Sequence, residues 1–251
     1  MSKIIAFIPA RYPSTRFPGK PLALISGKPM IQHVYERAQA CPELDETYVA
    51  TDDQRIYSCV EGFGGRAIMT AEDHQSGTDR IAEAAERLNV GPHNIVVNVQ
   101  GDQPLFQPSM LADLIRPLNE DRAIPMSTLM HGIEEEREIQ DPNNVKVVVD
   151  TNGYALYFSR LPIPFIRDKD SRPHYYKHIG MYAYRKEFLL TFTKLPYGRL
   201  EGVEKLEQLR ALEHGFKIKV IETPFDSTEV DVPEDVVEVE RQLAQLKSPG
   251  P

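Results

Sequence analysis

Length, composition and charge already exclude several classes of protein. The chain has 251 residues, 41% of them apolar, which is enough for one large α/β domain with a subdomain. Its formal net charge of −8 argues against nucleic acid or an anionic membrane as the main partner. No apolar stretch approaches the roughly 18 residues that span a bilayer, and the two cysteines form no disulfide framework. We therefore expect a cytoplasmic protein that neither inserts into membranes nor binds nucleic acid.

The chain begins with a strand pattern and a basic loop. Residues 4–8 form an apolar run typical of a buried strand, and the following loop carries Arg11, Arg16 and Lys20 but no acidic residue. Cations and free backbone N–H groups at the carboxyl end of a first strand are typical of a phosphate site in an open α/β sheet. A merely solvated basic loop is the alternative. The pattern favours a site for a triphosphate.

The rest of the first hundred residues alternates between helix and strand patterns. Pro29 opens a helix, and later elements are expected as a strand at 47–51, a helix around 56–63, a strand at 66–70, a helix at 81–88 and a strand at 95–99. Four such alternations are typical of a doubly wound α/β fold with a parallel sheet.

The pattern changes in the second half of the chain. Strand-like runs at 145–150 and 154–159 flank a Thr-Asn-Gly turn and predict a hairpin. Beyond it we expect a loop over 161–176, a strand at 177–185, a helix over 201–214 that buries Val203, Leu206, Leu209 and Leu212, and a strand at 217–222. Pro233 starts a last helix, expected to bury Val236, Val237, Val239 or Leu243, and Leu246.

Two aspartates stand out because of where they follow the pattern. Asp102 comes just after the strand at 95–99 and a glycine, and Asp231 stands two residues before Pro233. Taken alone, Asp102 is a simple turn residue and Asp231 is a helix cap. Two carboxylates brought together beside a triphosphate would instead hold Mg²⁺, which takes a few carboxylates together with phosphate oxygens.

Seven motifs in order give the chain a resemblance that covers nearly its whole length. It resembles the 3-deoxy-manno-octulosonate (Kdo) cytidylyltransferases, the CMP-Kdo synthetase family, with which sialic-acid cytidylyltransferases share the fold. The motifs are Ile-Pro-Ala-Arg-Tyr-x-Ser-Thr-Arg-x-Pro-Gly-Lys at 8–20, Asp-His-Gln-Ser-Gly-Thr at 73–78, Val-Asn-Val-Gln-Gly-Asp at 97–102, Tyr-Ala-Leu-Tyr-Phe-Ser-Arg at 154–160, Lys-His-Ile-Gly-Met-Tyr-Ala-Tyr-Arg at 177–185, Leu-Glu-Gln-Leu-Arg at 206–210 and Val-Asp-x-Pro-Glu-Asp at 230–235.

The resemblance implies a fold and a reaction. The fold is a doubly wound nucleotidyltransferase with a mixed sheet and a smaller sugar-binding and dimerisation subdomain. One domain over 1–251 is implied, with a nucleotide-binding half at about 1–125, an insertion at 126–230 and a closing helix after 231. The anomeric hydroxyl of the eight-carbon 2-keto sugar acid attacks the α-phosphorus of CTP, pyrophosphate leaves, and CMP-Kdo forms for lipopolysaccharide synthesis. A homodimer is implied as well.

By match to the motifs, the resemblance also implies which residues act. The catalytic residues are Lys20, Asp102 and Asp231, of which the two aspartates bind Mg²⁺. The nucleotide-binding residues are Pro9, Ala10, Arg11, Ser14, Arg16, Lys20, Gln75, Ser76, Gly77 and Gln100. The sugar-binding residues are Arg160, Arg167, His178, Tyr182, Glu207 and Gln208.

Departures from the family pattern leave the sugar open. The loop at 161–176 is short, and Glu229 stands where a glycine is common. Spare acids near the expected sugar pocket, at Asp168, Asp170, Asp226 and Glu229, suit the ammonium group of 8-amino-Kdo, which can only donate hydrogen bonds. Kdo is the default, and the amino sugar is the alternative. An inactive nucleotide-binding module is a third reading, which the complete set of Lys20, Asp102 and Asp231 disfavours.

Overall fold

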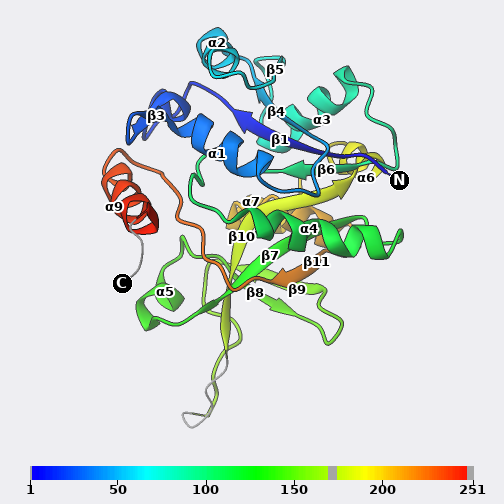
Figure 1. Ribbon diagram of the computed structural model, residues 1–251. Helices are drawn as coiled ribbons and strands as arrows, with labels where there is room; N and C mark the ends of the chain where they lie inside the picture. Colours follow the sequence, from blue (N-terminus) through cyan, green and yellow to red (C-terminus); the bar gives the residue numbers. More distant parts are fainter. Residues whose placement is uncertain (1, 169–173, 248–251) are drawn as a thin grey trace.

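A nine-stranded sheet forms the centre of the computed structural model, which describes residues 2–168 and 174–247 (Figure 1). One half of the sheet is parallel, in the order β5–β4–β1–β6. Its strands are β1 (Ile4–Ala10), β4 (Glu46–Thr51), β5 (Ala67–Met69) and β6 (Ile95–Asn98). The predicted parallel alternation is confirmed. Because parallel strands point the same way, their carboxyl ends lie along one edge.

The second half of the chain makes the sheet mixed. β10 (Tyr175–Arg185) runs antiparallel to β6 and to β7 (Met126–Ile133), while β11 (Lys219–Glu222) pairs in parallel with β7. The predicted hairpin is confirmed as β8 (Lys146–Val149) and β9 (Ala155–Ser159), and β8 also joins β10. A separate small sheet pairs β2 (Leu24–Ile25) with β3 (Lys28–Pro29). The boundary expected near residue 125 falls within one continuous sheet and stays a prediction.

Helices cover both faces of the large sheet. Side chains alternate along β1, so that Ile4, Ala6 and Ile8 pack with α1, α2 and α4, while Ile5 and Phe7 pack with α3 and α6. Figure 1 shows α1 and α4 in front of the sheet. The helices are α1 (Met30–Gln39), α2 (Gln54–Gly62), α3 (Gly77–Arg87), α4 (Pro108–Glu120), α5 (Glu136–Gln140), α6 (Lys186–Phe192), α7 (Arg199–Glu204), α8 (Leu209–Glu213) and α9 (Asp235–Lys247), with a short 3₁₀ helix, η1, at Lys20–Leu22. In the described ranges no helix is long and apolar enough to cross a membrane.

The helix predicted over 201–214 is wrong as a single element. α7 ends at Glu204, Lys205 takes a left-handed conformation with φ 55°, and α8 begins only at Leu209. Arg160 donates from Nε to the carbonyl oxygen of Glu204 at 2.7 Å, which satisfies a group that a continuous helix would have paired internally. Val203, expected inside, is 78% exposed, whereas Leu209 is buried.

Two other expectations need smaller corrections. β10 already begins at Tyr175, so the predicted loop over 161–176 ends sooner, and residues 169–173, Asp170 among them, lie outside the described residues. In α9, Val239 and Leu243 are buried as expected, but Val237 is 69% exposed and does not face the core. The side chain of Leu246 is also outside the described part.

A third, small core holds the last helix against the first half of the chain. Val230, Val239 and Leu243 pack with Ile25 and Met30. Val230 is fully buried in this cluster, directly before Asp231. Asp231, which comes late in the sequence, therefore lies at the end of the molecule that carries the basic loop, where Figure 1 shows α9 close to α1 and β3.

Candidate active site

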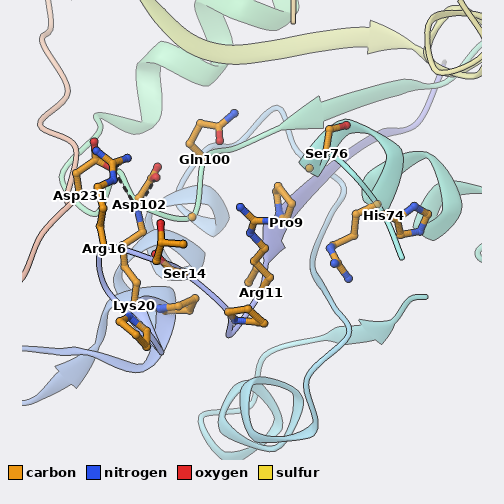
Figure 2. A pocket seen from close by; sticks show the side chains of 18 of the residues that line it. Pro9, Arg11, Ser14, Arg16, Lys20, His74, Ser76, Gln100, Asp102 and Asp231 are labelled. Carbon is orange, nitrogen blue, oxygen red and sulfur yellow. Dashed lines mark hydrogen bonds and ion pairs between the residues drawn. The ribbon is translucent and has the colours of Figure 1, made fainter. Parts of the chain in front are cut away.

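A cavity of about 720 Å³ opens at the carboxyl ends of β1 and β6. It is lined by the end of β1, the basic loop, the segment before α3, the turn after β6, and Asp231. All ten residues predicted to bind the nucleotide line this one cavity, as do both predicted metal ligands. Figure 2 shows Asp102, Asp231, Arg16 and Lys20 gathered at one end, with Ser76 and His74 at the other.

A backbone hydrogen bond between Gly19 and Tyr12 closes the basic loop. The backbone N–H of Gly19 donates to the carbonyl oxygen of Tyr12 at 2.9 Å. Gly19 has φ 72°, and a Cβ there would lie 3.0 Å from the Tyr12 ring, so a glycine is required. The guanidinium of Arg55 lies over the same ring, 3.3 Å from its centre. Tyr12 thus holds a compact loop whose cations point toward the cavity.

Four charged groups converge at the acidic end of the cavity. Lys20 Nζ donates to Asp102 Oδ2 at 2.8 Å and to the Val230 carbonyl oxygen at 2.8 Å, and it lies 3.6 Å from Asp231 Oδ1. Arg16 Nη2 donates to the same Asp231 oxygen at 3.0 Å. The backbone N–H of Asp231 donates to Asp235 at the start of α9, at 2.7 Å. Two carboxylates from distant segments therefore face a single ammonium group.

This arrangement fits Mg²⁺ as a partly protein-bound ion. Both aspartates face the ammonium group of Lys20, and their carboxylate oxygens are the hard ligands that Mg²⁺ prefers. Among the described residues no group of three His, Cys, Asp or Glu side chains could hold a metal by itself. The remaining ligands would have to be phosphate oxygens and water, as expected for a nucleotide-bound Mg²⁺.

Glu229 lies close to this pair, whereas the sequence analysis expected it near the sugar pocket. Burial, and after it the negative charge of Asp102, raise the pKa of Glu229 to about 7. Gln103 Nε2 donates to Glu229 Oε1 at 2.9 Å. The signal in the sequence was its position, two residues before Asp231.

The sequence analysis also gave no role to two ionisable residues that line the cavity, His74 and Arg80. Arg80 is 3% exposed and donates to Asp52 Oδ2 at 2.9 Å and to Thr70 Oγ1 at 2.6 Å. Asp52 follows β4, the parallel neighbour of β1. Because the carboxyl ends of parallel strands lie at one edge, the sequence could have predicted that Asp52 lies near the cavity. His74 Nε2 lies 2.5 Å from Glu83 of α3.

Polar contacts position two of the predicted nucleotide residues, Ser76 and Gln100. Ser76 caps α3, because its Oγ accepts from the backbone N–H of Asp79 at 3.1 Å. Gln100 Nε2 donates to the carbonyl oxygen of Gly180 in β10 at 2.7 Å, which ties the cavity to the second half of the sheet.

Four of the predicted sugar residues form a buried cluster behind the cavity. His178 Nε2 lies 2.8 Å from Thr128 Oγ1, its ring centre lies 5.5 Å from that of Tyr182, and Gln208 Nε2 lies 3.5 Å from His178 Nδ1. Burial lowers the pKa of His178 to about 3 and raises that of Tyr182 well above its usual value. Glu207 completes this sugar cluster. Among the described residues that line the cavity, none belongs to the sugar cluster.

Thr78 connects the cluster to the cavity. It follows Gly77 in the cavity wall, and its Oγ1 donates to Glu207 Oε2 at 2.5 Å. Burial raises the pKa of Glu207, and within the described structure its buried Oε1 has no hydrogen-bond partner. An unpartnered buried carboxylate oxygen is costly unless a ligand or water completes it.

The two predicted sugar-binding arginines lie elsewhere. Arg160 donates from Nη1 to the carbonyl oxygen of Pro142 at 2.9 Å, in addition to its bond with Glu204. Arg167 is exposed. The structure brings neither into the sugar cluster, and their role in binding the sugar stays a prediction.

Comparison with known proteins places the chain in a family. The family model described as cytidylyltransferase matches residues 5–219. A 3-deoxy-manno-octulosonate cytidylyltransferase from Syntrophus aciditrophicus is 57% identical over 239 residues, which cover 95% of this chain and 96% of the relative. An 8-amino-3,8-dideoxy-manno-octulosonate cytidylyltransferase from Shewanella piezotolerans is 55% identical over 242 residues, covering 96% and 98%.

Solved structures agree. A CMP:2-keto-3-deoxy-manno-octonic acid synthetase complexed with CTP matches with a TM-score of 0.92 and 45% identity, over 98% of this chain and 100% of that one. A 4-diphosphocytidyl-2C-methyl-D-erythritol synthase, 14% identical with a TM-score of 0.65 over 97% and 99%, shows the nucleotidyltransferase fold alone. The chain belongs to the cytidylyltransferase family and is a nucleotidyltransferase. The resemblance to the 3-deoxy-manno-octulosonate cytidylyltransferases that the seven motifs indicated is confirmed.

Proposed function

We propose that the protein transfers CMP from CTP to the anomeric hydroxyl of Kdo and releases pyrophosphate. In this step a bond forms between the sugar oxygen and the α-phosphorus while the bond to pyrophosphate breaks. The observation that carries the proposal is the single cavity in which the basic loop faces Asp102 and Asp231. The similar synthetase complexed with CTP supports the choice of nucleotide. The product, CMP-Kdo, serves lipopolysaccharide synthesis.

The chain's own residues supply position and charge for this reaction. Arg11, Arg16 and Lys20 line the cavity and can bind the triphosphate oxygens. Lys20 neutralises the charge that builds as pyrophosphate leaves, which is the main requirement of phosphoryl transfer. When bound, Mg²⁺ would be held by Asp102 and Asp231 and would supply charge neutralisation and acidify the attacking hydroxyl.

The sugar belongs beside the cavity in this proposal. The sugar cluster of His178, Tyr182, Glu207 and Gln208 is linked to the cavity wall through Thr78. Oε1 of Glu207 lies 4.0 Å from Arg210 Nη2 but has no hydrogen-bond partner among the described residues, so it is an acceptor suited to a sugar hydroxyl. The carboxylate of the sugar needs a cation, and Arg160 and Arg167 are the candidates that the family pattern supplies.

We also infer a homodimer that works in the cytoplasm. Exposed apolar side chains occur on two segments that the backbone N–H of Arg160 joins by donating to Glu204 Oε2 at 3.0 Å. They are Leu156, Leu161 and Phe165 on and after β9, and Tyr197, Leu200 and Val203 before and on α7. Light scattering should give the mass of two chains, and Val203→Glu should shift it toward one. A monomeric wild type would contradict the inference. The free thiols of Cys41 and Cys59 support a reducing compartment.

Pyrophosphate release tests the reaction. The protein is assayed with Mg²⁺ and each of CTP, UTP, ATP and GTP, with no sugar, with Kdo and with 8-amino-Kdo. We expect release only with CTP and a sugar. A kcat/KM at least tenfold higher for 8-amino-Kdo would replace Kdo by the amino sugar as the substrate. Absence of release under every condition would leave an inactive nucleotide-binding module.

A further inference from the structure

The separation of Asp102 and Asp231 is set by contacts between two distant segments. Asp102 follows β6, whereas Asp231 belongs to the segment that leads into α9. A metal ion that takes only two protein oxygens depends on this separation, because a displacement of about 1 Å is enough to spoil a site.

Few contacts connect the two segments directly. The backbone N–H of Val230 donates to the Asp102 carbonyl oxygen at 2.9 Å. Lys20 bridges Asp102 and the Val230 carbonyl oxygen, but in the proposed reaction its ammonium also serves the triphosphate. Leu105 and Val230 also share the third core. Among the described residues, the direct side-chain hydrogen bond between the two segments runs from Gln103 Nε2 to Glu229 Oε1 at 2.9 Å.

The residues of this contact are placed where they can act on both carboxylates. Gln103 directly follows Asp102, and Glu229 stands two residues before Asp231. Gln103 is 1% exposed, and in the described structure its Oε1 has no partner, so its buried amide is satisfied mainly through Glu229. Burying an amide is unfavourable unless its hydrogen bonds are made, so the buried side chain of Gln103 depends on its bond to Glu229.

We propose that Gln103 and Glu229 form a positioning pair that holds Asp102 and Asp231 at the separation required for a nucleotide-bound divalent cation. The inference rests on the proposed function. Neither residue touches the nucleotide in this proposal: both are absent from the cavity lining and act through the aspartates beside them.

Three variants separate the hydrogen bond from the charge. Gln103→Ala and Glu229→Ala both remove the bond. Glu229→Gln removes the charge but keeps an oxygen that can accept from Gln103. Binding of Mn²⁺ with CTP is followed by electron paramagnetic resonance, CTP binding is measured by calorimetry in EDTA, and thermal unfolding checks the fold. The Mg²⁺ concentration for half-maximal pyrophosphate release is measured in parallel.

We expect both alanine variants to weaken Mn²⁺ binding in the presence of CTP about tenfold, the lower end of the effect of removing groups that orient metal ligands. Glu229→Gln should stay within about twofold of the wild type, and CTP binding in EDTA should not change in any variant. An equal loss in Glu229→Gln and Glu229→Ala would overturn the proposal, since charge would then be responsible. So would unchanged Mn²⁺ binding in Glu229→Ala, provided that its thermal unfolding matches that of the wild type. Failure of the proposed function itself would appear separately, as a wild type that releases no pyrophosphate.

Discussion

The cavity and the sugar cluster, which Thr78 connects, differ in how their charged side chains are stabilised. In the cavity Lys20 and Arg16 pair with Asp102 and Asp231 at a water-accessible surface. In the sugar cluster burial lowers the pKa of His178 to about 3 and raises that of Glu207. In the proposed function, the first region would exchange its ion pairs for a polyanion and a cation. The second, where burial disfavours the charged forms of His178 and Glu207, would bind the sugar through hydrogen bonds.

The largest effect is expected when one of the two carboxylate charges of the cavity is removed. Asp102→Asn or Asp231→Asn should lower Mg²⁺-dependent pyrophosphate release by about 10²-fold or more, because one charged ligand of the cation is lost. Circular dichroism should show an unchanged fold. Asp113→Asn, which disturbs only a surface pair with Arg116, is the matched control. Near-normal turnover in either variant would remove that aspartate from the metal site.

A smaller effect is expected when the positive charge is removed. Lys20→Ala should lower kcat roughly 30-fold and raise the KM for CTP by less, since its interaction strengthens as charge builds on pyrophosphate. Steady-state kinetics with CTP varied at saturating sugar measure both constants. Lys28→Ala, at a surface pair with Glu36, controls for loss of a lysine. A change confined to KM would make Lys20 a ground-state binder.

The connection between the two regions can be cut at Thr78. Thr78→Val keeps the shape but leaves the buried Glu207 Oε2 without its donor, and should lower the free energy of unfolding by about 1–3 kcal/mol. We expect the KM for the sugar to rise while the KM for CTP stays the same. Urea unfolding and kinetics with each substrate provide the measurements. If neither sugar nor CTP kinetics responded, the cluster would not belong to the sugar site.

The smallest effect concerns the neutrality of the sugar cluster. The folded pKa of His178, about 3, lies below the unfolded value of about 6.5, so the unfolded chain takes up the proton first. The contribution of neutral His178 to the free energy of unfolding is therefore fully present above pH 6.5. It is lost as the pH falls toward 3, by about 1.4 kcal/mol per pH unit. Unfolding free energies at pH 7 and 5.5 should differ less in His178→Gln than in the wild type. Equal differences would show that His178 is not held neutral.

Local patterns sufficed wherever one physical rule governed a segment. The strand at 95–99 and the basic loop follow from an apolar run and a cluster of cations, and both are confirmed as elements of one cavity edge. The helix over 201–214 failed because a break at Lys205 is stabilised by Arg160, a residue some forty positions away in the sequence. Periodicity along the chain carries no information on such a partner. α4, β7 and α6 were not predicted at all.

By itself the sequence determined the class of protein, the residues available for a triphosphate and two candidate metal ligands, because these depend on motifs and on the rule that parallel strands end at one edge. Only the tertiary structure decided which groups meet. It placed Asp231 beside Lys20, brought Gln103 into hydrogen-bond contact with Glu229, and connected the sugar cluster to the cavity wall through Thr78. Such contacts join residues far apart in the chain, and their existence depends on the packing of α9 and β10 rather than on any local preference.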